Sequence, residues 1–357
     1  MSDEPPGADL NADHDLDFHT VDLATSADAE AEVKQLLHEN GLDLDEQVDS
    51  FIVCRQGGRL VGCAGLDRDV VKDVAVAADL RGNSVSLGLG SAVLKMAADR
   101  GHHDLFLYCR PDHVKLFRGW TFHPLVEIPD VMTLMENNPV ALDKYCEKLA
   151  RGRKPGKTIG GIVLNANPFT LGHKALVERA AGECDWLHVF VVEEDASQFP
   201  YPDRFKLVSE GLRGIEKLTV HQGSKYVISR ATFPGYFLKE KAAVETSFTG
   251  IDLLMFRERI APALGITRRY VGTEPLDATT RRYNESMKHW LQDAPSKAPP
   301  VETVVVERLA VGGAPVSATE VRRKLAQGDL AGIEALVPPT TLAFLKAQAS
   351  HQKDDRP

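Results

Sequence analysis

The two halves of the chain differ in how apolar and polar positions follow one another. Residues 51–66 contain two strand-like apolar runs on either side of a Gln-Gly-Gly turn at 56–58, which is typical of a β-hairpin. Apolar runs and helical spacing predict the other elements of this half: strands at 70–77, 104–109 and 120–125, and a helix from Gly90 to Arg100. The first half is therefore expected to be an α+β domain.

From residue 159 onward, predicted strands and helices alternate. Strands are expected at 159–165, 186–192, 217–221, 268–272 and 301–309, and helices at 173–184, 203–214, 251–264, 278–291 and from Ala318 onward. Repeated βα units with apolar strands predict a parallel sheet that is covered by helices on both faces. Ligands of such sheets bind at the carboxyl ends of the strands.

The length of 357 residues favours two domains, because one hydrophobic core rarely organises so long a chain. A basic segment with Gly and Pro predicts a linker at 151–158. The acidic start has neither a basic region nor an apolar stretch, so it does not resemble a signal peptide. The predicted organisation is a disordered lead-in at 1–18, a first domain at 19–150, the linker, a second domain at 159–347 and a tail at 348–357.

Composition narrows the function classes. With 43% hydrophobic and 26% charged residues the chain is close to soluble globular averages, and no apolar run is long enough to cross a bilayer, so no membrane partner is expected. A net charge of −9 argues against a nucleic-acid partner, which requires clustered Lys and Arg. The five cysteines form no close pair, so neither a disulfide framework nor a zinc site is predicted, and a cytoplasmic setting is favoured.

The first candidate motif follows the first strand of the second half, at 165–173. A turn from a strand into a helix is where bound phosphate is expected. Its T-x-G-H core is similar to the signature of the HxGH nucleotidyltransferase superfamily, which implies that Thr170 and His173 contact ATP phosphates and that Gly172 permits close approach. His173 would stabilise charge on the α-phosphate. The alternative is that Thr170 only caps the helix and His173 is a surface residue. Other expected ATP contacts here are Asn165, Asn167, Pro168 and Phe169.

A second motif lies at 316–322, and it is similar to the ISxTxxR signature of the same superfamily. Ser317 followed by Glu320 predicts a capping box, so the segment opens a helix whose first N–H groups can hold an anion. The hydroxyls of Ser317 and Thr319 are expected to add to this anion site, and Arg322 is expected to bind the departing pyrophosphate. Alone, the segment would be an ordinary helix start.

Other candidates are less specific. Gly272, Thr273 and Glu274 follow a strand and resemble the superfamily loop that lies against adenine and ribose. Arg204 begins a helix and is expected to order the ATP site, the alternative being a solvated helix start. No cage of carboxylates is present for a metal, and Mg²⁺ is expected to bridge the ATP phosphates. The segment 224–237 has no simple period, so it is either an ordinary loop or a site for acetate or a thiol; its candidate residues are Ser229, Arg230 and Tyr236.

The sequence around these motifs resembles that of the citrate lyase ligase family over nearly all of residues 159–345. The resemblance is carried by segments such as NANPFTLGH, EDASQFPYPDR, VGTEP and LVPPTTL. The order of elements in the first half resembles a GNAT-type acetyltransferase, whose turn before the long helix, here Arg81 to Gly90, would hold a pyrophosphate. The resemblance implies an α/β fold with a Rossmann-like, doubly wound nucleotidyltransferase domain preceded by an α+β GNAT-like domain.

The same resemblance implies an activity. Members of this family use ATP and acetate to acetylate the thiol of the phosphoribosyl-dephospho-CoA group on the citrate lyase acyl carrier subunit, through acetyl-adenylate, with release of AMP and pyrophosphate. Two alternatives are a simple adenylyltransferase acting on a nicotinamide or pantetheine phosphate, and a nucleotide sensor without turnover. The first half and the 224–237 segment favour the ligase, because a minimal adenylyltransferase needs neither, and the intact motif residues argue against the sensor.

Overall fold

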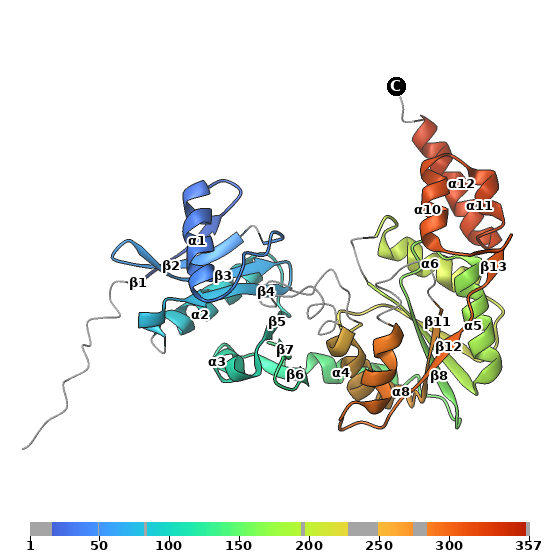
Figure 1. Cartoon of the computed structure of the whole chain (residues 1–357), viewed down its shortest axis with the longest axis horizontal. Helices are drawn as coiled ribbons and strands as arrows, with labels where there is room; N and C mark the ends of the chain where they lie inside the picture. The colour runs from blue at the N-terminus through green and yellow to red at the C-terminus, as the bar shows by residue number, and fades with distance from the viewer. Residues whose placement is uncertain are drawn as a thin grey trace, which may run out of the picture. The chain divides into compact units, whose positions relative to one another are not determined.

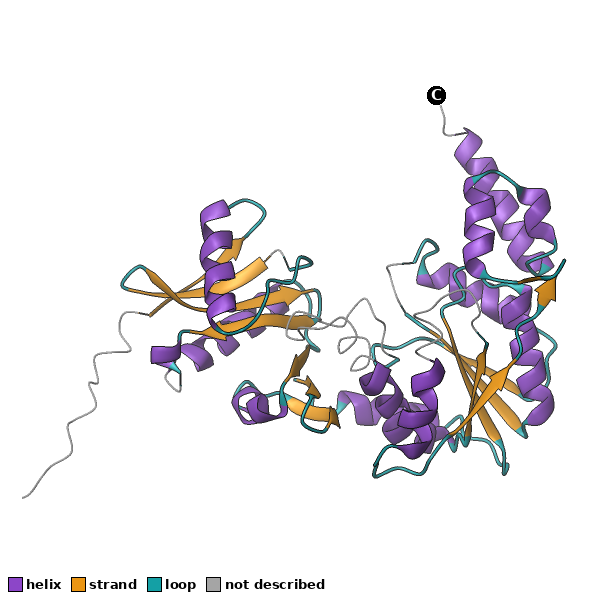
Figure 2. Cartoon of the chain, in the orientation of Figure 1, coloured by secondary structure: helices purple, strands orange, loops and turns teal. Residues whose placement is uncertain are grey.

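A computed structural model of the chain describes residues 16–48, 50–81, 84–193, 197–227, 249–273 and 284–354 (Figures 1 and 2). The chain divides into two compact units, and the second begins at Ala141. Each unit has its own sheet and its own hydrophobic core. Among the described residues, no helix is both long and apolar enough to cross a membrane.

The first unit is built on a mixed sheet with the strand order β1-β2-β3-β4-β5-β7-β6. Of its described strand pairs only β4 and β5 run parallel. The strands are β1 (Leu16–Asp22), β2 (Ser50–Gln56), β3 (Arg59–Asp67), β4 (Val70–Val76), β5 (Phe106–Cys109), β6 (His123–Ile128) and β7 (Met132–Glu136), and the helices are α1 (Ala27–Glu39), α2 (Ser84–Asp99) and α3 (Val114–Arg118). The predicted hairpin is confirmed as β2 and β3.

Two expectations for this unit are wrong. Strand β1 begins at Leu16, so the end of the expected lead-in is part of the sheet. Helix α2 begins at Ser84, so most of the expected phosphate-binding turn is helical. Gly88 and Gly90 serve packing instead: a Cβ at Gly88 would lie 2.2 Å from the ring of Phe18, and one at Gly90 would lie 2.6 Å from the ring of Trp120.

The second unit contains a parallel sheet with the order β10-β9-β8-β11-β12. All five strands predicted for this half are present: β8 (Ile159–Leu164), β9 (Trp186–Val191), β10 (Leu218–His221), β11 (Arg268–Gly272) and β12 (Glu302–Val306). The sheet grows outward in both directions from β8 and β11, and the crevice at such a switch of direction is where ligands bind. The doubly wound prediction is confirmed.

Helices cover both faces of this sheet (Figure 1). On one face, α5 (Leu171–Glu183) and α6 (Tyr201–Gly211) pack on Leu187, Val189 and Val191. On the other face, α4 (Ala141–Ala150) and the helix at 249–264, which includes α8 (Ala261–Leu264), pack around Phe190. Strand β8 fits between these layers because residue 160 is glycine. A Cβ at Gly160 would lie only 2.7 Å from Cys184 Sγ.

Helix α4 therefore belongs to the second unit, although it lies before the expected linker at 151–158. Leu149 joins the same core as Ile260 and Leu264, and Cys146 Sγ donates to the carbonyl of Arg259 at 3.5 Å. The last described elements are a short hairpin and three helices, whose small core also includes Phe199 from the segment before α6. These elements are β13 (Ala310–Val311), β14 (Ala314–Pro315), α10 (Ala318–Ala326), α11 (Leu330–Glu334) and α12 (Pro339–Asp354).

Candidate nucleotide site

The start of α5 fixes the orientation of His173. Thr170 is the N-cap residue, and its Oγ1 accepts a hydrogen bond from the backbone N–H of His173 at 3.3 Å. In return, His173 Nδ1 accepts the backbone N–H of Thr170 at 3.1 Å and lies 3.0 Å from its Oγ1. Because Nδ1 is an acceptor here, the proton of the neutral imidazole is assigned to Nε2. His173 thus offers Nε2–H as a donor.

Burial keeps this imidazole neutral. Partial desolvation of the half-buried ring, followed by the positive charge of Arg308, lowers the pKa of His173 to about 4. The ring of Phe169 stacks on it with centroids 5.8 Å apart and planes 15° apart. Phe169 is completely buried, and it fits because a Cβ at Gly211 would lie 2.6 Å from its ring. Phe169 therefore packs against His173 in the core. This burial does not support the expected contact between Phe169 and ATP.

Thr170 likewise acts through His173. Its side chain is buried, with 1% exposed, and its hydroxyl is within the cap. The cap holds the imidazole in one orientation, which supports a positioning role for Thr170. Thr170 is the N-cap residue, as the alternative has it, and its expected contact with ATP stays a prediction. His173 is held in the turn by two hydrogen bonds and a stacked ring.

The two motifs meet although they are far apart in the sequence. A Cβ at Gly172 would lie 2.9 Å from the backbone oxygen of Val316, so glycine permits the second motif to approach the first. Arg322 completes this contact: Nη1 donates to the carbonyl of Asn167 at 2.6 Å, and Nη2 donates to Thr319 Oγ1 at 3.1 Å. The close approach predicted at Gly172 is therefore made by the protein's own backbone.

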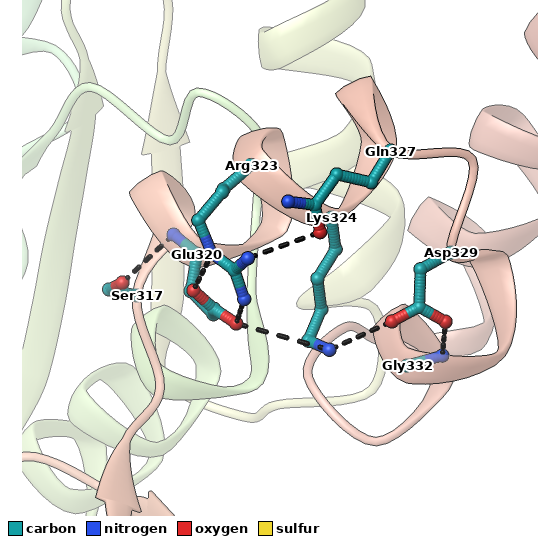
Figure 3. Close-up of polar contacts among 7 residues, drawn as sticks. All are labelled: Ser317, Glu320, Arg323, Lys324, Gln327, Asp329 and Gly332. Atoms are coloured by element: carbon teal, nitrogen blue, oxygen red, sulfur yellow. Dashed lines mark hydrogen bonds and ion pairs between the residues drawn. The ribbon is translucent and has the colours of Figure 1, made fainter.

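At the start of α10, only one of the two hydrogen bonds of the predicted capping box is formed. Ser317 is the N-cap, and its Oγ accepts the N–H of Glu320 at 3.1 Å. The Glu320 carboxylate does not reach back to Ser317; it accepts from Arg323 at 2.8 and 2.6 Å (Figure 3). Lys324 extends this surface network to Asp329, which in turn accepts the N–H of Gly332 (Figure 3). Arg323 thus lies in a surface network, one residue away from the inward-bonded Arg322.

Arg204 ties together three backbone segments around the first motif. It is completely buried, and Nη1 donates to the carbonyls of Asn165 and Val192, both at 2.8 Å, while Nε donates to Phe199 at 3.0 Å. These carbonyls belong to the turns after β8 and β9 and to the segment before α6. The expected ordering role is supported, but a completely buried guanidinium does not face a ligand. The solvated alternative is wrong.

The asparagines of the first turn also hold the backbone. Asn165 Oδ1 accepts from Arg204 at 3.0 Å and from Ser197 Oγ at 3.2 Å, and Asn167 Oδ1 accepts the N–H of Phe199 at 3.2 Å. The Asn167–Pro168 peptide bond is cis, and Pro168 is buried. Asn165 is exposed and Asn167 is half-buried, so Asn165 is the most open of these three residues to a ligand.

The end of β11 contributes an open position and a cation that the sequence analysis missed. Among the described residues, the nearest atom to a Cβ at Gly272 would be Arg308 Nε, at 4.0 Å, so none of them fills this position. Thr273 Oγ1 accepts the N–H of Arg308 at 3.1 Å, which holds Arg308 beside the turn. The position of Arg308 just past the last parallel strand is the sequence signal that could have identified it. Glu274, Ser229, Arg230 and Tyr236 lie outside the described residues.

Comparison with known proteins identifies the chain. Residues 159–345 match the family model described as "Citrate lyase ligase C-terminal domain". The [Citrate [pro-3S]-lyase] ligase of Escherichia coli K12 is 46% identical over 91% of this chain and 92% of its own length, and that of Klebsiella pneumoniae is 49% identical over 90% and 94%. The chain belongs to the citrate lyase ligase family.

Among solved structures, Escherichia coli ElaA aligns with 34% of this citrate lyase ligase family member and 99% of its own chain, at 18% identity and a TM-score of 0.31. In the described residues of the chain, no group of three or more His, Cys, Asp or Glu side chains is placed to hold a metal. What the site does contain is a set of donors for a polyanion: His173, Asn165, Arg322, Arg308 and the start of α10. The arrangement can bind and stabilise a phosphate chain.

Proposed function

We propose that this chain is a [citrate (pro-3S)-lyase] ligase, which acetylates the thiol of the phosphoribosyl-dephospho-CoA group on the citrate lyase acyl carrier subunit. The observation that carries the proposal is the joining of the two motifs by Arg322 beside an imidazole fixed as an Nε2 donor. The family membership and the identity over about nine-tenths of the chain support the same activity.

The reaction has two steps. A carboxylate oxygen of acetate attacks the α-phosphorus of ATP, and the bond between this phosphorus and the oxygen that bridges to the β-phosphate breaks. Pyrophosphate departs, and acetyl-adenylate remains. The thiol then attacks the acetyl carbon, the carbon–oxygen bond to AMP breaks, and the thiol proton passes to solvent. The products are the acetyl thioester, AMP and pyrophosphate.

Each site residue has a role that follows from its contacts. His173 Nε2–H donates to the α-phosphate as negative charge builds there, and its low pKa keeps it a neutral donor. Arg322 and the start of α10 stabilise the leaving pyrophosphate. Thr170, Phe169 and Arg204 hold this geometry, and Gly272 and Thr273 border the place for the nucleoside.

Mg²⁺ fits this site only through ATP. Because the described residues bring no cluster of metal ligands together, the ion would be held by phosphate oxygens and water, as hard oxygen ligands suit it. When bound, it neutralises phosphate charge. The protein's own contribution remains the donors named above.

ATP–pyrophosphate exchange tests the proposal. The full chain is incubated with ATP and labelled pyrophosphate, with acetate, without acetate, or with nicotinamide mononucleotide or pantetheine phosphate in its place. Label should enter ATP only when acetate is present, because acetyl-adenylate formation is reversible. Exchange that requires a nucleotide or pantetheine phosphate would instead establish an adenylyltransferase.

A further inference from the structure

The side chain of Asn284 lies at the carboxyl end of β11, beside the proposed nucleotide site. Its Nδ2 donates to the carbonyl of Gly272, the last residue of that strand, at 2.9 Å. The other end of the amide, Oδ1, is shielded from solvent and has no hydrogen-bond partner among the described residues. Buried polar atoms are nearly always paired, so this acceptor calls for a donor from outside the described chain.

The hydrogen bond to Gly272 also settles which end of the amide is oxygen. If the two ends were exchanged, Oδ1 would face the carbonyl oxygen of Gly272, and two acceptors would oppose each other. The free end of Asn284 is therefore an acceptor, and a ligand group that pairs with it must be a donor.

Packing alone does not explain an amide at this position. Residues 284–293 are helical, and Met287 and Leu291 lie in the core beside the sheet. Asn284 is three residues before Met287 and seven before Leu291, so it continues the same face of the helix. An apolar side chain would extend this face at no polar cost. The amide stands where the face reaches the end of β11.

The far end of this helix is fixed to the body of the second unit. The buried guanidinium of Arg257 donates through Nη1 to the carbonyls of Trp290 at 3.0 Å and of Ala294 at 2.9 Å. Asn284 is thus held at both ends, by this anchor and by its own bond to Gly272. A fixed acceptor can discriminate between ligands, because it cannot turn away from a group that fails to pair with it.

The place beside Gly272 indicates which part of a nucleotide meets this acceptor. No described atom comes closer than 4.0 Å to a Cβ at Gly272, so the backbone presents a flat surface there. In the proposed site the phosphates lie by His173 and Arg322, which leaves the end of β11 to the nucleoside. Adenine presents an exocyclic N–H donor, whereas guanine presents an oxygen acceptor at the same place on its ring.

We propose that Asn284 Oδ1 accepts a hydrogen bond from the exocyclic amine of adenine and thereby selects ATP over GTP. Asn284 belongs to neither of the two motifs, so it adds a specificity-determining residue to the site. The inference rests on the proposed function, since it concerns the nucleotide of the first step.

The test compares nucleotides that differ in this amine, using the full chain. They are ATP, GTP and purine riboside triphosphate, which is ATP without the amine. The variants are Asn284→Ala and Asn284→Leu; the second is close in size and continues the apolar face, so it keeps the helix packed. The matched control is Glu285→Ala, the exposed next residue. One readout is acetate-dependent exchange of pyrophosphate into each nucleotide, and the other is nucleotide affinity by calorimetry without acetate.

The wild type should prefer ATP over both other nucleotides by at least about tenfold in kcat/KM, because they leave the buried acceptor unpaired. The preference should appear mainly in KM, since a contact to the base is the same before and during the chemical step. Both Asn284 variants should lose about tenfold on ATP and much less on purine riboside triphosphate. Glu285→Ala should keep the wild-type ratio.

Three results would overturn the inference. Equal losses on ATP and on the analogue would mean that the amide only supports the turn after β11. A wild type that uses the analogue as well as ATP would show that the amine is not recognised. If the variants instead erased a preference for ATP over 2′-deoxy-ATP or 3′-deoxy-ATP, the acceptor would bind the ribose.

Failure of the proposed function gives a different result. Exchange by the wild type that does not depend on acetate would contradict the ligase activity. The calorimetric ratio between ATP and its analogue needs no acetate, so it tests Asn284 separately.

Discussion

The nucleotide site of the second unit and a cavity of the first unit lie at the same kind of place but differ in chemistry. In the second unit the nucleotide site is at the carboxyl ends of β8 and β11, where the parallel sheet changes direction. In the first unit a cavity of about 540 Å³ lies at the carboxyl ends of β4 and β5, where the parallel pair separates. The nucleotide site is formed by fixed polar donors, whereas the cavity has a largely apolar lining.

This difference has a physical reason. A developing charge on phosphorus requires donors that are already oriented, so His173 is held by a cap and a stacked ring. The cavity of the first unit is lined instead by strand ends and apolar side chains such as Val74 and Leu107. Substitutions in the second unit should therefore change the chemical step, and substitutions in the first should leave that step unchanged.

The largest effect is expected for His173→Ala. Its hydrogen bond strengthens as charge develops on the transferring phosphate, so adenylate formation should fall by on the order of 10²-fold or more, with little change in ATP binding. The control is Lys174→Ala, the next residue of α5. Adenylate formation by rapid quench and ATP affinity by calorimetry measure the two effects. An unchanged rate in His173→Ala would remove this residue from the mechanism.

Two adjacent arginines provide the next comparison. Arg322→Ala should weaken ATP use and pyrophosphate-driven reversal by roughly 2 kcal/mol, about thirtyfold, because it removes a charge-assisted contact that also joins the motifs. Arg323→Ala removes an exposed ion pair with Glu320 and a hydrogen bond to Gln327, and it should leave ATP use and its reversal nearly unchanged. Steady-state kinetics in both directions distinguish them. Equal losses in both variants would mean that the helix start is merely structural.

A buried imidazole pair should make the second unit sensitive to acid. His188 Nδ1 lies 2.9 Å from His221 Nε2, and burial lowers the pKa of both to about 4. Because the unfolded chain binds these protons near pH 6.5, their contribution to stability is complete above that pH and is lost as the pH falls toward 4. The loss at pH 5 should be on the order of 1–2 kcal/mol per imidazole.

Urea unfolding at pH 7 and pH 5 measures this loss. The variant His188→Gln/His221→Gln should show a smaller drop between the two pH values than the wild type, whatever its stability at pH 7. An identical drop in both proteins would show that these imidazoles do not contribute to acid sensitivity.

A pair of glycines in α5 tests the contact between the motifs with the smallest change. Gly172→Ala should cost about 1–3 kcal/mol in the free energy of unfolding, because the new methyl group meets the backbone of Val316. Gly182→Ala, on the same helix, has no atom of the described residues within 4 Å of the new Cβ and should stabilise by up to about 1 kcal/mol. Thermal unfolding of the two variants gives the comparison, and a harmless Gly172→Ala would refute the close approach.

Sequence reasoning succeeded where the signal is local. The five apolar strands of the second half and the cap at Thr170 depend on residues within a few positions of one another, and all are present. The two motifs were expected to share one site, and the structure brings them into contact. Their direct contact, however, depends on Gly172 meeting Val316, and neither residue signals this partner in the sequence.

The failures share one cause, which is that tertiary contacts decide what a residue does. Gly88 and Gly90 have the composition of a turn but accommodate Phe18 and Trp120 within a helix. Phe169 has the position of a ligand contact but fills the core beside Gly211. Arg308 could not be selected by spacing, because a hairpin separates it from the second motif and only the fold brings it near His173.

In the proposed first step acetate itself attacks the α-phosphate of ATP, and transfer of an oxygen label from acetate to AMP tests this step. The full chain is supplied with ATP, the carrier subunit and acetate that carries ¹⁸O in both oxygens, and the AMP is analysed by mass spectrometry. If acetyl-adenylate forms, the bridging oxygen remains on phosphorus when the thiol attacks carbon, so each AMP should carry one ¹⁸O. AMP without ¹⁸O, formed together with acetylated carrier, would contradict the account.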